Sequence, residues 1–178
     1  MDSPTPSPMI PTQAILPLTR EREMELRHRL VAEALTWERT PYYNLGDTKG
    51  VGVDCCMLLV RSLIDAGIVE PFDPRPYPTQ WHLHNDEERY LAWMNLCGVE
   101  VEEPQIGDVV VWRFGRCFSH SAFLVSPGVV VHALADHREC SRTDMNEAFL
   151  HWLDKTGTRR RPVKYFDLFA RLRETAGE

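Results

Sequence analysis

The apolar residues of this 178-residue chain change their spacing near residue 104, and this change constrains the fold more than any other feature. Before it, apolar side chains recur at helical intervals, and after it short apolar runs are separated by turns. We predict helices over residues 18–38, 55–67 and 85–97, and strands over residues 109–112, 119–125, 129–133 and near 161–166. Helices followed by a strand meander predict an α+β domain.

Proline sets the N-terminal segment apart from this domain. Five of the thirteen prolines lie within residues 1–17, and a segment so rich in proline forms neither a helix nor a central strand. We therefore predict a proline-rich arm over residues 1–17, one domain over residues 18–170 and a C-terminal tail over residues 171–178. We expect the arm to lie on another protein chain.

Composition excludes several classes of function. The net charge of −6 argues against specific nucleic-acid binding, which needs a basic excess. No apolar stretch approaches the roughly 20 residues of a membrane span, and the N-terminus lacks the pattern of a signal peptide. We expect synthesis in the cytoplasm without an export signal. The five cysteines are odd in number and show no C-x-x-C spacing, which argues against a disulfide framework or a zinc ribbon.

Cys55 is the cysteine best placed to act as a nucleophile. It follows Asp54, a potential N-cap residue, in the first turn of the second predicted helix. The free backbone N–H groups and the dipole at a helix start favour a thiolate, so we expect Cys55 to be ionised. These N–H groups could also form an oxyanion hole. We expect Cys56, about 100° further around the helix, to face the core.

Two histidines supply the other parts of a nucleophilic site. A nucleophilic cysteine needs a base, and the base needs a group that orients it. His120 and His132 lie on consecutive predicted strands, joined by a Pro127-Gly128 turn. Counted from this turn, the two histidines are not directly opposite, so a bulge or a stagger must bring them together. We predict Cys55 as nucleophile, His120 as base and His132 as orienting group.

The motifs around these residues resemble those of NlpC-type cell-wall cysteine peptidases. Gly52-Val53-Asp54-Cys55 is similar to their nucleophile motif, and the segments Ser119–Val125 and Val131–Ala133 resemble their two histidine strands. Pro104–Val109 resembles their P-G-D segment. Thr40-Pro41-Tyr42 is similar to a T-P-Y motif whose tyrosine lines the site near the oxyanion hole, although Tyr43 could take that role instead.

The resemblance implies a papain-like NlpC-type fold, with N-terminal helices packed on a small antiparallel β-sheet. It implies a cysteine endopeptidase or amidase that acts on peptidoglycan stem peptides, commonly between D-glutamate and a diamino acid, without a cofactor. Tyr42 and Asp54 would then belong to the oxyanion and substrate-binding part of the site. The chain departs from the family pattern at Cys56-Met57, where a glycine is usual after the first residue, and this departure leaves the substrate preference open.

Further segments resemble the branch of this family found among tail genes of phages and gene transfer agents. They are the loop Lys49–Cys55, the segment Pro76–Trp81 and the acidic run Glu87-Glu88-Arg89. This branch implies a virion tail protein that acts at the host cell wall or periplasm, with tail-tip proteins as partners of the arm. It also implies Trp81 as a wall of the substrate groove, although Trp81 could equally be an ordinary core anchor. The alternative is a structural tail-tip or baseplate subunit whose hydrolase site is weak or unused.

Two rival chemistries have weak support. His82-Leu83-His84 and the acidic residues after it include ligand types that zinc accepts, but no distant third ligand is indicated by spacing. We therefore predict no metal. A serine hydrolase is disfavoured because the chain has no G-x-S-x-G elbow.

Overall fold

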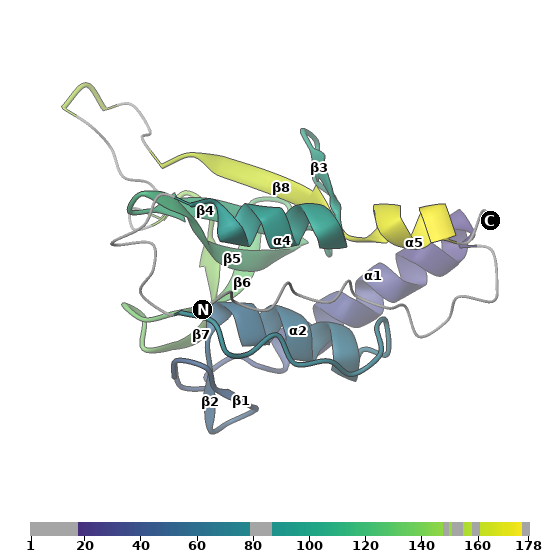
Figure 1. Cartoon of the computed structure of the whole chain (residues 1–178), viewed down its shortest axis with the longest axis horizontal. Coiled ribbons are helices and arrows are strands. Elements are labelled where there is room, and N and C mark those ends of the chain that lie inside the picture. The colour runs from purple at the N-terminus through teal and green to yellow at the C-terminus, as the bar shows by residue number, and fades with distance from the viewer. Residues whose placement is uncertain (1–17, 79–86, 148–149, 151–154, 158–160, 176–178) are drawn as a thin grey trace.

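The computed structural model describes residues 18–78, 87–147, 150, 155–157 and 161–175. The proline-rich arm, Trp81, and the histidines at 82 and 84 lie outside these residues. The elements are, in chain order, α1 (Arg20–Leu35), β1 (Asp47–Thr48), β2 (Gly52–Val53), α2 (Cys55–Asp65), α4 (Arg89–Cys97), β3 (Val99–Val101), β4 (Val109–Phe114), β5 (Cys117–Ser126), β6 (Val129–Leu134), β7 (Glu139–Asp144), β8 (Val163–Asp167) and α5 (Phe169–Thr175) (Figure 1).

The larger sheet is antiparallel and has the strand order β3-β8-β4-β5-β6-β7. The predicted strands are confirmed as β4, β5, β6 and β8, each with bounds shifted by one or more residues. Strand β7 was not predicted, because the charged run Asp136–Glu139 resembles a loop and the residues after it are mostly polar. Pairing with β6 along its whole length makes this segment a strand. Helix α5 crosses residue 170, where we placed the end of the domain.

Local capping explains where the helices begin and end. The Thr19 side chain accepts a hydrogen bond from Arg22 N at 3.2 Å, and the Asp54 side chain accepts one from Met57 N at 2.8 Å, so each caps its helix. Helix α2 ends as predicted, with Gly67 in the left-handed region at φ 63°. Helix α4 begins only at Arg89.

The helices pack on one face of the sheet, as the layers in Figure 1 show. Helix α2 lies against α1 and against β5 and β6, and it contributes several fully buried side chains to this core, including Leu58, Leu59 and Leu63. The opposite face of the sheet buries a second cluster around Trp112, which Met145 and Leu150 cover. The first residues of α2, including Cys55, therefore lie next to the central strands β5 and β6.

A buried arginine joins the first helix to the sheet. Arg27 is fully buried, and its guanidinium lies 2.6 Å from carboxylate oxygens of both Asp108 and Asp167 and 2.9 Å from Glu23. Asp108 also accepts a hydrogen bond from Gln105 N at 2.8 Å, which closes the turn before β4. Paired charges of this kind are stable only as a set, because removal of one leaves another buried without compensation.

Candidate active site

Asp54 connects three parts of the chain at the start of α2. Besides capping the helix, its carboxylate accepts hydrogen bonds from Leu45 N at 2.8 Å and from the Tyr77 hydroxyl at 2.8 Å. Asp54 is almost fully buried, and burial raises its pKa while these hydrogen bonds oppose the rise. We placed Asp54 in the oxyanion and substrate-binding part of the site. In the structure its oxygens bind the backbone and Tyr77, and the residue lines the cavity described below.

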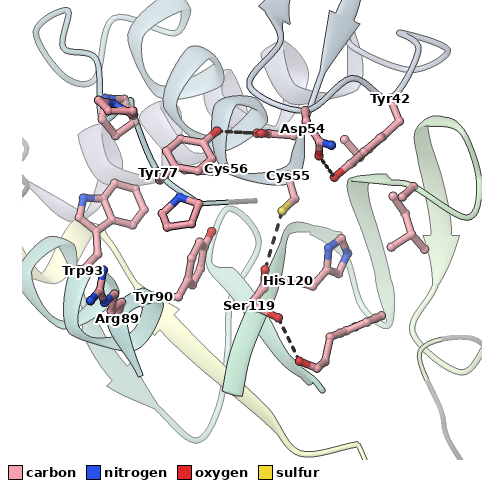
Figure 2. A pocket seen from close by; sticks show the side chains of 18 of the residues that line it. Tyr42, Asp54, Cys55, Cys56, Tyr77, Arg89, Tyr90, Trp93, Ser119 and His120 are labelled. Atoms are coloured by element: carbon pink, nitrogen blue, oxygen red, sulfur yellow. Dashed lines mark hydrogen bonds between the residues drawn. The ribbon is translucent and has the colours of Figure 1, made fainter. Parts of the chain in front are cut away.

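Cys55 opens α2, and its side chain faces this cavity (Figure 2). The Sγ atom donates a weak hydrogen bond to the Ser119 carbonyl at 4.0 Å. Burial, followed by the negative charge of Asp54, raises the pKa of Cys55 to about 12. The raised pKa therefore opposes the predicted ionisation of this thiol in the resting protein. The loss of hydration and the nearby carboxylate outweigh the helix dipole, so the thiol is protonated at neutral pH.

His120 and His132 are neighbours, as predicted. Their Nε2 and Nδ1 atoms lie 2.8 Å apart, although the residues are separated by twelve positions in the chain. The pairing of β5 with β6 shifts register between Leu124 and Ser126, and this irregularity is the stagger that the turn count required. The structure thus places an imidazole in position to orient His120.

The second histidine is held neutral. His132 is fully buried, and burial lowers its pKa to about 3, with a smaller contribution from His137. Its Nε2 atom lies 3.0 Å from the Thr143 hydroxyl. A neutral imidazole donates a hydrogen bond through one ring nitrogen and accepts one through the other. The direction of the hydrogen bond between His132 and Thr143 therefore fixes the direction of the one between His132 and His120.

Cys55 and His120 line the same cavity, which has a volume of about 370 Å³. Tyr77, Tyr90 and Trp93 form an aromatic wall on one side, as Figure 2 shows. The rest of the lining combines the prolines and small side chains with Tyr42, Phe114 and Leu134, and with the charged residues Asp54, Arg89 and Asp136. An apolar cavity with few polar groups around a nucleophile is the usual form of a substrate site.

The two candidate tyrosines are separated by the structure. Tyr42 lines the cavity and donates a hydrogen bond to Asn44 Oδ1 at 3.0 Å, and burial raises the pKa of its hydroxyl. The Tyr43 side chain is exposed to 69%. Tyr42 is therefore the tyrosine at the site, and its contact with an oxyanion stays a prediction.

Three residues make contacts at the site that the sequence did not predict. Tyr77 binds Asp54, and the Tyr90 hydroxyl lies 2.5 Å from Ser121 Oγ, which in turn lies 3.5 Å from the Cys55 carbonyl. No local pattern marks these contacts, because they join a loop, a helix and a strand. Cys56 packs on the core as predicted and also lines the cavity, and burial keeps its thiol protonated by raising its pKa.

The described residues contain no cluster of three or more histidine, cysteine, aspartate or glutamate side chains that could hold a metal ion. The histidines at 82 and 84, on which a metal site was considered, lie outside this part of the chain. No helix within the same described ranges is long and apolar enough to cross a membrane.

Comparison with known proteins gives a fold but no sequence relative. No family model and no curated protein matches this sequence. Among solved structures, NlpC2 from Trichomonas vaginalis matches with a TM-score of 0.55 and 15% identity over 79% of this chain and 46% of that chain. A hypothetical invasion protein of Mycobacterium tuberculosis matches with a TM-score of 0.54 and 15% identity over 91% of this chain and 70% of that chain. The chain has the NlpC/P60 fold.

The NlpC/P60 fold recurs in a third structure, the P60 domain of an M. avium subspecies paratuberculosis antigen, with a TM-score of 0.51 and 14% identity over 82% of this chain and 96% of that chain. The predicted α+β, papain-like fold is therefore confirmed. The chain spans less than half the length of the two Trichomonas proteins that it matches. The activity and the substrate must consequently be argued from the residues of the site.

Proposed function

We propose that the protein is a cysteine endopeptidase or amidase that hydrolyses peptidoglycan stem peptides. The observation that carries this proposal is the meeting of Cys55 and His120 at one cavity, with His132 at 2.8 Å from His120. The NlpC/P60 fold and the motifs around these three residues support the cell-wall substrate class. No cofactor is required by this chemistry.

The arrangement supports a general-base mechanism. Because the resting thiol is protonated, His120 takes the Cys55 proton as Sγ attacks the scissile carbonyl carbon. The carbonyl electrons move to oxygen, where backbone N–H groups at the start of α2 and the Tyr42 hydroxyl stabilise the oxyanion. The C–N bond then breaks, and the proton on His120 passes to the leaving amine. Water, deprotonated by His120, hydrolyses the thioester and releases a carboxylate and the thiol.

The cavity also supports a short peptide as substrate. Its aromatic wall offers apolar contact, while Arg89 contributes a cationic side chain and Asp54 and Asp136 contribute anionic ones. Stem peptides carry both carboxylates and amines, so charges of both signs at the site suit them. A cavity of about 370 Å³ accommodates a few residues rather than a folded protein.

Purified peptidoglycan provides the test. The wild-type protein is expected to release peptide fragments or free amines, and Cys55→Ala is expected to release none. Cys117→Ala, which removes a buried thiol outside the cavity lining, serves as the control. Circular dichroism of all three proteins checks that each is folded. Equal release by the wild type and Cys55→Ala would overturn the proposal.

We further propose that the hydrolase belongs to a phage or phage-like tail, made in the host cytoplasm and acting at the host cell wall during DNA entry. The resemblance of Lys49–Cys55 and Pro76–Trp81 to the tail branch supports this setting, and the proline-rich arm is then a contact to tail-tip proteins. In particles, deletion of residues 1–17 is expected to block incorporation of the protein. Normal incorporation of the deleted protein would count against this setting.

A structural tail-tip subunit with a weak or unused site is the second candidate. The feature that favours it is the proline-rich segment over residues 1–17, whose composition suits a contact with another protein chain. Particles that carry Cys55→Ala distinguish the two roles. A structural role predicts unchanged infectivity, whereas a required hydrolase predicts a loss of infectivity on cells with an intact wall.

A further inference from the structure

A line of hydrogen bonds extends from the cavity beyond His132. His132 Nε2 lies 3.0 Å from Thr143 Oγ1, Thr143 Oγ1 lies 3.4 Å from Ser141 Oγ, and Ser141 Oγ lies 2.8 Å from His137 Nδ1. Together with the 2.8 Å contact between His120 and His132, these contacts join five side chains in sequence. Only the first two belong to the predicted catalytic set.

Strand register produces this line. In the pairing of β6 with β7, His132 lies opposite Ser141, and Thr143 follows two residues later on the same face. His137 lies in the connection between the two strands, and its ring meets that of His132 edge to face, with centroids 5.4 Å apart. Ser141 and Thr143, whose polarity kept β7 from being predicted as a strand, are therefore part of this line of hydrogen bonds.

The direction of these hydrogen bonds decides whether His120 can act as a base. Since Nε2 of His120 contacts His132, the proton from Cys55 must go to Nδ1. Nδ1 accepts a proton only when the neutral ring carries its own proton on Nε2. That proton is donated to His132 Nδ1, so His132 donates from Nε2 to Thr143, Thr143 donates to Ser141, and Ser141 donates to His137 Nδ1.

The reverse direction disables the base. If His137 carries its proton on Nδ1, it donates to Ser141, and the hydroxyl groups then donate back towards His132. His132 in turn donates from Nδ1 to His120 Nε2, which leaves the His120 proton on Nδ1. In that tautomer His120 has no acceptor for the Cys55 proton. The two directions contain the same number of protons and differ only in where each proton lies.

The structure favours the first direction. His137 Nε2 lies 3.7 Å from the Glu147 carboxylate, and a carboxylate beside one nitrogen of a neutral imidazole attracts the proton to that nitrogen. Nδ1 is then left as an acceptor for Ser141. His137 is partly exposed, with 22% of its side-chain surface accessible, so water could satisfy its ring nitrogens in place of Ser141 and Glu147.

We infer that Thr143, Ser141 and His137 are positioning residues that hold His120 in the tautomer able to accept the Cys55 proton, through a continuous line of hydrogen bonds. The inference rests on the proposed function for its consequence, but the tautomer itself can be observed without any substrate.

Nitrogen NMR of the histidine rings tests the inference at about pH 8, where an ordinary imidazole is neutral. The His120 signals are assigned by comparison with His120→Gln. In the wild type we expect His120 to be protonated on Nε2. In Thr143→Val, which removes the hydroxyl but keeps the shape, and in His137→Ala, we expect a mixture of tautomers. Thr143→Ser is expected to restore the wild-type spectrum.

Peptide release measured on the same proteins adds a kinetic outcome. Loss of one hydrogen bond changes an equilibrium by about tenfold, so kcat/KM of Thr143→Val is expected to fall roughly tenfold through kcat, with KM unchanged. Arg142→Ala, which alters an exposed side chain on the same strand, serves as the control. Thr143→Ser is expected to recover the rate.

The outcomes separate the two proposals. An unchanged His120 tautomer in folded Thr143→Val and His137→Ala would overturn the inference, whatever the activity. A purely structural role predicts lower thermal stability of these variants with the wild-type tautomer retained, and that result also overturns it. A shifted tautomer in the variants, combined with no peptide release even by the wild type, would leave the inference standing and refute the proposed function.

Discussion

The Tyr77 hydroxyl lies 2.8 Å from both carboxylate oxygens of Asp54, so the residue that caps α2 also binds the loop that walls the cavity. Arg75, two residues earlier, donates hydrogen bonds to the Leu45 carbonyl and to Asp47 Oδ2, each at 2.8 Å. The loop before α4 is thus attached at two points to the segment that leads into Cys55. A displacement of this loop, which lines the cavity, should therefore also displace the segment that positions Cys55.

Tyr77→Phe is expected to loosen this loop without removing a catalytic group. It loses one hydrogen bond to a buried carboxylate, which costs about 1.5–3 kcal/mol of unfolding free energy. We expect KM for peptide to rise more than kcat falls. Urea denaturation and steady-state kinetics measure the two effects, with Tyr43→Phe, at an exposed tyrosine, as the control. A change confined to kcat would contradict the proposed role of the loop.

Asp54→Asn is expected to lower the pKa of Cys55. The Asp54 charge is the second cause, after burial, of the high pKa of Cys55 near 12, and asparagine removes that charge while its side-chain oxygen can still cap the helix. The rate of alkylation by iodoacetamide, measured against pH, should therefore rise at lower pH than in the wild type. Cys55→Ala identifies the part of the signal that comes from Cys55. An unshifted profile would show that the carboxylate does not influence the thiol.

The burial of neutral His132 is expected to make the protein less stable in acid. Its pKa falls from an ordinary 6.5 to about 3, so between these values the unfolded chain binds a proton that the folded protein does not. Above pH 6.5 His132 is neutral in both states and does not lower the unfolding free energy. As the pH falls from 6.5 towards 3, protonation of His132 in the unfolded chain lowers the unfolding free energy by at most about 1.4 kcal/mol per pH unit.

Denaturant unfolding at several pH values measures this slope. In His132→Asn, which lacks the titrating ring, the unfolding free energy should depend less steeply on pH between 6 and 4 than in the wild type, as the lowered pKa requires. Parallel curves for the two proteins would mean that other groups dominate acid unfolding.

Arg27→Ala is expected to be one of the most destabilising single changes in the chain. It leaves the carboxylate of Asp108 buried without its cationic partner, at a cost of about 3–5 kcal/mol, whereas Asp167 keeps its ion pair with Arg173. Arg22→Ala on the same helix removes an exposed pair with Glu25 and should cost about 0.5 kcal/mol or less. Urea denaturation of both variants gives the comparison, and similar losses would refute the stabilising role of the buried cluster.

Local interactions explain what could be predicted. The start of α2 at Cys55 follows from a capping aspartate and an apolar helix, and the central strands follow from short apolar runs between turns. The pairing of His120 with His132 followed from two strands joined by one turn. Each of these features depends on residues that are close in sequence, or on pairing across a single hairpin.

Only the tertiary structure decided the chemistry of these residues. The thiol of Cys55 is protonated because its hydration is lost on packing, an effect that the residues beside it in the sequence do not reveal. The contact between Tyr77 and Asp54 joins residues 23 positions apart, and β7 becomes a strand only by pairing with β6. The sequence alone therefore determined which groups could react, whereas the fold determined their protonation and their partners, because both depend on what packs around each group.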